Sequence, residues 1–335
     1  MNQTVRVDIP FWSIAKVFFV GLIFYLLFMV RDIIALFFIV LVFTASFRPI
    51  VNRWEKKIGR PLSVLALVAL VILAVAMVAY LVVPPVIIQT KQLIENIPDI
   101  LNKYAFLKER VPSINEGIST LTKNFGNITN SFVSITAGIF GGVIAFFTAI
   151  VMIIYLLLDK NGIPLFVKSV VSPDQQDTVM NLAKKISYKV GSWFRGQMLL
   201  GGIIGVLDLI GLTIIGAPYA LMLAVVSAVL EIIPTIGPLI AGTIAVLVTL
   251  GSSPLQALFV LILYIVVQQV ENSFIVPKVM QKAVGLSPVI IILAILTGAK
   301  LLGVVGAILA VPIAASISVI VQEWPALREN LKKNE

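Results

Sequence analysis

The fold of this chain is decided by the stretch Leu230-Glu231-Ile232-Ile233-Pro234-Thr235-Ile236-Gly237-Pro238. Glu231 is the only charged residue between Leu209 and Val270, an apolar tract long enough to be embedded in a membrane. The two prolines remove amide donors and clash with the preceding turn, so a helix that enters this stretch must stop. Broken backbone at membrane depth is tolerated only where it is buried in protein or lines a wet cavity.

A carboxylate at that depth costs about 3 kcal/mol on insertion scales, so Glu231 is a candidate functional residue. The alternative is a kinked helix in which Glu231 caps a neighbouring helix or pairs with a lysine. Helix-breaking residues and a charge coincide closely here, which favours the functional interpretation.

Composition indicates an all-α polytopic membrane protein. Of the 335 residues, 59% are hydrophobic and only 12% are charged, whereas soluble domains average about 25% charged residues. The net charge of +9 comes from basic residues in short loops, as the positive-inside rule predicts, so we expect no nucleic-acid partner. The absence of cysteine and histidine excludes disulfides, Ser-His hydrolysis and histidine-held zinc or haem. We expect no cofactor, no metal site and no catalytic residue.

Hydropathy predicts six full spans plus two interrupted helical units that are either re-entrant or fully crossing. The predicted spans are 11–30, 33–47, 61–83, 138–158, 199–216 and 254–270, and the interrupted units are 219–250 and 286–321. Each half of 219–250 is too short to cross about 30 Å of hydrocarbon untilted. Residues 48–60 carry five basic residues and one acid, which places this loop and both termini in the cytoplasm.

The chain divides into six regions. They are an N-terminal three-span region 1–83, a helical arm outside the membrane 84–137, a fourth span 138–158, a cytoplasmic segment with an amphipathic interfacial helix 159–198, a transport core 199–321 and a cytoplasmic tail 322–335. We expect Pro84-Pro85 to end the third span. The arm carries two apolar stripes of 3.5-residue period, 93–107 and 114–135, which predict either a hairpin closing on itself or a contact between subunits of a homo-oligomer.

The amphipathic helix is predicted to begin at Ser172-Pro173, with serine as the N-cap and proline in the first turn. Its apolar stripe includes Val190 and Trp193, and three lysines lie on the other side. Such a helix lies in the membrane interface or packs on cytoplasmic loops. In the span that follows, Asp208 either faces an aqueous or protein-lined site or pairs structurally, for instance with Lys300.

A transport site is predicted between the two interrupted units, because paired interrupted segments mark such sites in transporters. A polar substrate requires donors and acceptors in the wall, and a coupled proton or sodium ion requires a carboxylate. Glu271 is alternatively an interfacial residue at a span end, and Gln268-Gln269 are alternatively contacts between helices. The candidate substrate- or ion-binding residues are Asp208, Glu231, Pro234, Thr235, Gly237, Pro238, Gln268, Gln269, Glu271, Asn272 and Lys300.

Several of these residues form motifs that resemble the autoinducer-2 exporter family of bacterial membrane proteins. The motifs are Glu231-x-x-Pro234-x-x-Gly237-Pro238, Gln268-Gln269-Val270-Glu271-Asn272 followed by Pro277, Leu286-Ser287-Pro288, and Gly303-x-x-Gly306 with Ala310-Val311-Pro312. They cover about residues 191–316. The resemblance implies a homo-oligomeric bacterial cell-membrane transporter that exports a small polar molecule such as a quorum-sensing signal, with a few relatives resembling sodium/proton antiporters. Many relatives carry histidine at Ser287 and small apolar residues near Lys300.

The leading hypothesis is therefore secondary transport by alternating access, with the lipid bilayer as surroundings. No Walker A sequence is present, so ATP is not the expected driver. The alternatives are a sodium/proton-type antiporter and a passive channel or scaffold. An intramembrane enzyme would depend on Asp208 or on the distant pair Ser287 and Lys300, and we do not expect an enzyme.

Overall fold

The computed structural model describes residues 11–103, 145–280 and 285–332, and every regular element in these ranges is a helix. Besides the short helix Ala145–Leu158, the helices are α1 Phe11–Met29, α2 Arg31–Ile58, α3 Arg60–Lys103, α6 Gly162–Val170, α7 Pro173–Ile215, α8 Ala220–Leu230, α9 Ile236–Ser252, α10 Pro254–Val270, the π-helix η1 Glu271–Ile275, α11 Val276–Val279 and α12 Pro288–Lys332.

Five of the described helical stretches are long and apolar enough to cross a membrane. They are Arg31–Ile58, Arg60–Met77, Gln175–Ile215, Pro254–Val279 and Pro288–Pro325. Shorter apolar helices accompany them, among them α8 and α9. The predicted fold class, an all-α polytopic membrane protein, is confirmed.

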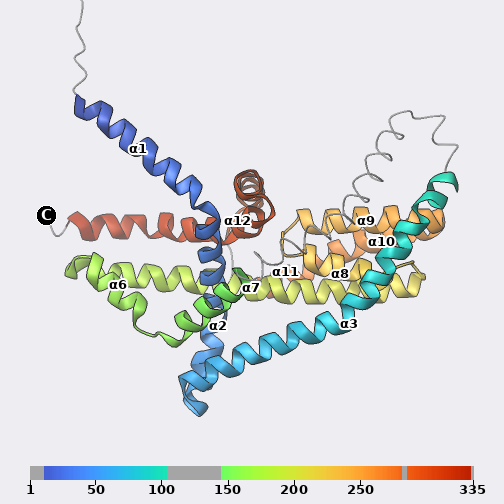
Figure 1. Ribbon diagram of the computed structural model, residues 1–335, viewed down its shortest axis with the longest axis horizontal. Helices are drawn as coiled ribbons and strands as arrows, with labels where there is room; N and C mark the ends of the chain where they lie inside the picture. The colour runs from blue at the N-terminus through green and yellow to red at the C-terminus, as the bar shows by residue number, and fades with distance from the viewer. Residues whose placement is uncertain (1–10, 104–144, 281–284, 333–335) are drawn as a thin grey trace, which may run out of the picture.

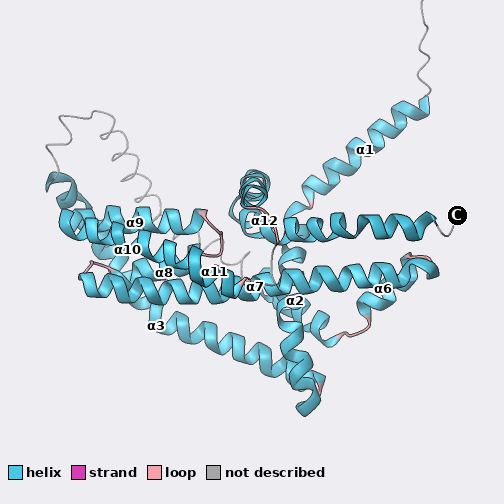
Figure 2. Cartoon of the chain, turned by 180° about the vertical axis from the view of Figure 1, so that it is seen from behind, coloured by secondary structure: helices cyan, strands magenta, loops and turns pink. Residues whose placement is uncertain are grey.

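Helix α7 is the axis on which the other elements are assembled. It runs along most of the long dimension of the molecule (Figure 1) and contacts α2, α6, α8, α10, α11 and α12. Helices α8, α9 and α10 gather around its C-terminal half, whereas α6 and the end of α12 lie near its N-terminal half, as the view from behind also shows (Figure 2). One long helix thus connects the predicted transport core to the predicted cytoplasmic segment.

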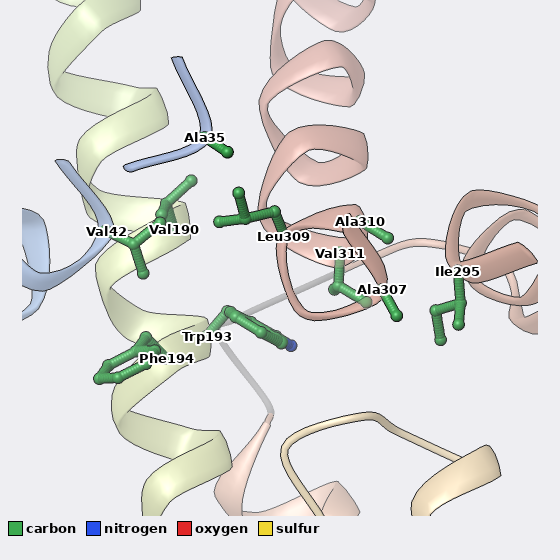
Figure 3. Packing of buried hydrophobic residues seen from close by; sticks show 10 residues of the cluster. All are labelled: Ala35, Val42, Val190, Trp193, Phe194, Ile295, Ala307, Leu309, Ala310 and Val311. Carbon is green, nitrogen blue, oxygen red and sulfur yellow. The ribbon is translucent and has the colours of Figure 1, made fainter. Parts of the chain in front are cut away.

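The largest buried cluster joins α7 to α2 and α12. Trp193 and Phe194 of α7 lie between Val42 of α2 and Val311 of α12 (Figure 3). Trp193 is only 2% exposed, so this part of α7 is buried against α2 and α12. The amphipathic stretch and the following span, predicted as separate segments, form a single helix whose apolar stripe packs on protein. Its position relative to the membrane interface stays a prediction.

The prolines at 84 and 85, which were predicted to end the third span, do not end the helix. Helix α3 continues through both to Lys103. Membrane helices tolerate proline because neighbouring groups satisfy the freed backbone atoms. Beyond the prolines α3 is anchored to the bundle: the Gln89 side chain accepts a hydrogen bond of 3.0 Å from the Met222 amide in the first turn of α8.

The predicted loop 48–60 is also helical, since α2 extends through Pro49 to Ile58 and α3 begins at Arg60. The corner between them is held by the Arg60 guanidinium. Its Nε donates to the Leu157 carbonyl oxygen at 2.6 Å and its Nη1 donates to Glu55 at 3.1 Å. A cation placed on the last carbonyls of a helix stabilises that helix end, so Arg60 ties the helix Ala145–Leu158 to α2 and α3.

Some predictions fall outside the described residues. These are most of the arm, including its stripe at 114–135, and the start of the predicted fourth span at 138–158. The predicted tail 322–335 is helical as far as Lys332, where α12 ends.

Candidate functional site

The predicted break at 231–235 is present between α8 and α9. Helix α8 has 11 residues and α9 has 17, so at 1.5 Å per residue they measure about 17 Å and about 26 Å. Both are shorter than the hydrocarbon core of about 30 Å. Helix α8 starts at Tyr219 in the left-handed region, and α9 is followed directly by α10.

The backbone at this break is strained. Thr235 has φ 68° and ψ −47°, and the Ile236 amide donates to the Pro234 carbonyl oxygen at 2.7 Å across it. This is the rare type of γ-turn, and positive φ is unusual for a β-branched residue. A Cβ on Gly237 would collide with the carbonyl oxygen of Leu230. The turn therefore requires glycine at 237 and keeps Thr235 in a conformation that must be held by its surroundings.

Three acidic residues from three separate elements meet beside this break. Asp208 lies on α7, Glu231 follows α8, and Glu271 begins η1. Their exposed fractions are 1%, 1% and 5%. All three were candidates from sequence, and the structure brings them together, although Asp208 and Glu271 are 63 residues apart by their numbers.

The negative charge of this cluster is not neutralised by a basic side chain. Within the described ranges the ion pairs lie elsewhere, on Asp32, Glu55 and Glu323. Neither carboxylate oxygen of Asp208 has a hydrogen-bond partner there. The pairing of Asp208 with Lys300, raised as an alternative from sequence, is therefore absent.

Glu231 and Glu271 face each other. Both side chains line the same small cavity, and one carboxylate oxygen of Glu231 has no hydrogen-bond partner within the described residues. Gln268 donates a hydrogen bond of 3.1 Å to Glu271. The cluster therefore gathers buried carboxyl groups that have no ion pair with a basic side chain within the described residues.

The chain segment that presents Glu271 is a π-helix. The amide of Val276 bonds to the carbonyl oxygen of Glu271, five residues back. Single turns of π-helix are uncommon and occur frequently at functional sites. The helical chain continues past Glu271 to Val279, and the Glu271 side chain is buried, which argues against the alternative of an interfacial residue at a span end.

The acids line a small closed cavity of about 10 Å³, the space needed for about one water molecule. We call it the carboxyl chamber. Its walls are Ile204, Asp208, Ser227, Glu231, Pro238, Tyr264, Val267, Gln268 and Glu271.

Two larger cavities flank the carboxyl chamber. One, of about 380 Å³, lies between the two interrupted units and contains Glu231 and Pro234 from one side and Pro288 and Val311 from the other. The other, of about 620 Å³, lies between α9 and α10 and shares Tyr264 and Gln268 with the chamber. Glu231 thus borders the first large cavity, and Gln268 borders the second.

The second interrupted unit is also present. Helix α12 is broken at Leu302 and Gly303, where Gly303 has φ 62°. Its two halves fold onto each other so closely that a Cβ on Gly298 would collide with the Gly306 carbonyl oxygen, and the reverse holds as well. Small residues allow the backbones of two membrane helices to approach closely. Here Gly298 and Gly306 allow the two halves of α12 to do so.

Of the remaining predicted site residues, some line the larger cavity and others line none of the three cavities. Thr235, Gln269 and Asn272 line the larger cavity together with Gln268. Gly237 lies in none of the three cavities and serves the turn instead. Lys300 is exposed on α12, lines none of the three cavities, and is not brought to the acids.

Three further polar residues were missed from sequence. The Gln197 amide donates to the Glu231 carbonyl oxygen, and the hydroxyls of Ser227 and Tyr264 share a hydrogen bond of 2.8 Å. Each is a neutral polar residue within an apolar helix. That pattern alone would have identified them, because buried polar groups in membranes require partners.

Comparison with known proteins gives the same picture of a transporter. A profile of the AI-2E transporter family matches residues 14–326. The chain is 30% identical over 289 residues to YueF of Bacillus subtilis (strain 168), provisionally named a transport protein, covering 81% of this chain and 78% of YueF.

A second relative in the same strain, YrrI, also provisionally named a transport protein, is 26% identical over 333 residues, or 95% of this chain and 90% of YrrI. PerM of Escherichia coli (strain K12), provisionally named a permease, is 25% identical over 267 residues, or 74% of this chain and 75% of PerM. The chain belongs to the AI-2E transporter family.

Proposed function

We propose that this protein is a secondary transporter that exports a small polar molecule by alternating access, driven by proton exchange in the carboxyl chamber. The observation that carries the proposal is the placement of Asp208, Glu231 and Glu271 in one closed cavity between two larger ones. To couple proton movement to substrate transport, a carboxyl group must be accessible to protons from one side of the membrane in one conformation and from the other side in another.

The proton is favoured over sodium by the geometry of the acids. No group of three or more acidic side chains within the described residues is arranged to hold a metal ion. Buried carboxyl groups that have no basic partner are costly while charged, and each loses that cost by binding a proton. Sodium/proton exchange is the second candidate, supported by the number of carboxyl groups in the chamber.

The substrate is assigned to the cavity between the interrupted units, where Gln197 and Glu231 supply polar groups among apolar walls. Its volume of about 380 Å³ lies in the range of sites for small molecules. Glu231 borders both this cavity and the carboxyl chamber, so substrate binding and proton exchange meet at one side chain.

The test uses proteoliposomes and autoinducer-2 as the probe substrate. Uptake that saturates with concentration and rises when a pH gradient is imposed supports a proton-coupled carrier. Uptake that rises linearly and ignores the gradient indicates a channel instead. A proton signal on addition of sodium, in the absence of autoinducer-2, favours the antiporter.

We further propose that the protein works as a homo-oligomer through the arm, which lies mostly outside the described residues. Replacing Leu121 and Phe125 with aspartate should weaken assembly, because charges in an apolar helical seam oppose packing. Native mass spectrometry of the wild type and the double variant measures this. A wild type that is monomeric throughout would contradict the proposal.

A further inference from the structure

The cavity of about 620 Å³ between α9 and α10 is a second site, separate from the one assigned to the substrate. The two helices are sequence neighbours joined at Ser253 and pack closely. The N-terminal end of α9 therefore lies beside the C-terminal end of α10. We call this cavity the lateral groove.

One part of the lateral groove is apolar and faces the surroundings of the bundle. Leu239 and Ile265 on its walls are 72% and 59% exposed. Since α9 and α10 belong to the membrane-embedded part, exposed apolar side chains there meet acyl chains. Gly242 lets α9 approach Tyr264 of α10 closely, because a Cβ at that position would lie 3.1 Å from the Tyr264 ring. A hydrocarbon chain can enter from the bilayer without displacing charge.

The other end of the lateral groove is polar and uncharged. Thr235 at the start of α9 lies with Gln268, Gln269 and Asn272 at the end of α10, and no charged side chain lines the groove. Amide side chains both donate and accept hydrogen bonds. Gln268 and Gln269 donate within the chain, to Glu271 and Ser273. A polar head group would exchange hydrogen bonds with these amides, because polar groups in hydrocarbon gain from a partner.

We infer that the lateral groove binds a neutral amphipathic molecule from the bilayer, with one hydrocarbon chain along α9 and α10 and a hydroxyl, ester or amide head at the four polar residues. A neutral head fits because the lining carries no charge. A carboxylate head would face the acids of the chamber immediately behind Gln268. This inference concerns binding and does not depend on the transported substrate.

Gln268 connects this site to the carboxyl chamber. Its side-chain amide lines both cavities and donates the hydrogen bond to Glu271. A head group that takes this donor competes with Glu271 for it. Occupancy of the lateral groove thereby changes the hydrogen bonding of the chamber, which gives a bilayer component a route to regulate it.

The experiment uses a monoacylglycerol with a diazirine in its chain, added to the full-length protein in phosphatidylcholine nanodiscs, with cross-linked residues mapped by mass spectrometry. Cross-links should concentrate on residues 239–247 and 261–269 and be displaced by unlabelled monoacylglycerol. The corresponding fatty acid should cross-link at least fivefold less.

Leu261→Trp, in the groove, should reduce cross-linking at least fivefold. Leu258→Trp, equally exposed on α10 but outside the groove, should not.

Gln269→Leu tests the head-group end without filling the groove, and should also reduce cross-linking. Cross-links spread evenly over all exposed helices, or unchanged by both Leu261→Trp and Gln269→Leu, would overturn the inference. So would cross-links between two protomers across the groove when a bifunctional thiol reagent is attached to Ile265→Cys, because the groove would then be covered by a second copy of the chain.

Discussion

At the scale of single residues, the proposed proton coupling requires carboxyl groups that are buried in apolar helices without a basic partner. Asp208 is the extreme case, since both of its oxygens are buried and unpartnered within the described part of the chain. An isolated polar group in such a place lowers stability, and is retained where it serves function.

Asp208→Asn should therefore stabilise the protein and impair transport. An amide is less costly to bury than a carboxylate, and an unsatisfied buried group costs about 1–3 kcal/mol, so the apparent melting temperature should rise. Thermal unfolding in detergent and autoinducer-2 uptake in proteoliposomes measure the two effects. A variant that is less stable than the wild type but transports normally would show that Asp208 has a structural role.

All three acids were predicted as candidates from sequence, because a charge within an apolar tract needs an explanation. Their convergence was beyond sequence reasoning, since the order of α7, α8 and α10 along the chain does not fix which faces meet. Lys300 was also predicted as a site residue, and it does lie in the second interrupted unit. Its side chain is nevertheless exposed and does not line the carboxyl chamber.

At the scale of elements, the strained break between α8 and α9 positions Glu231. The break was predicted from two prolines and a glycine, and it is present. The prolines at 49, 84 and 85 were predicted to lie at or beyond helix ends, yet α2 and α3 continue through them. A proline removes one hydrogen bond, which packing can compensate. At 231–238 a second proline, a glycine and a carboxylate act together, and the helix stops.

Gly237→Ala should disrupt this break and lower both stability and transport. The new Cβ would collide with the Leu230 carbonyl oxygen, which belongs to the backbone and cannot move aside easily. Gly202→Ala on α7 is the matched control, since nothing lies within 4 Å of its Cβ. Replacing a helical glycine by alanine stabilises a helix by about 0.5–1 kcal/mol, so the control should unfold at the same or a higher temperature. Equal behaviour of the two variants would contradict the strained turn.

At the scale of the whole molecule, we predict the orientation in the membrane from the basic residues at the corner of α2 and α3, which favour the cytoplasmic side. The protein lacks cysteine, so single cysteines report on a clean background. Lys57→Cys should be protected from an impermeant thiol reagent in intact cells, whereas Lys103→Cys at the end of α3 should be labelled. Labelling of position 57 from outside would reverse the orientation and with it the direction of transport.

The long helix α7 joins the two ends of the molecule, carrying Trp193 in the core with α2 and α12 and Asp208 in the carboxyl chamber. Movement of α12 against α7 would therefore act on both the substrate cavity and the chamber. We expect proton exchange at Glu231 to drive this movement in the direction of transport.

The most direct test is Glu231→Gln in proteoliposomes, with Glu323→Gln as the control because Glu323 pairs with Lys185 away from the chamber. Glutamine keeps the size and hydrogen bonding of Glu231 but cannot exchange a proton. For the correctly folded variant, we expect autoinducer-2 exchange without a gradient to continue, and the stimulation by an imposed pH gradient to fall at least about tenfold. Stimulation equal to that of the wild type and of Glu323→Gln would contradict the account.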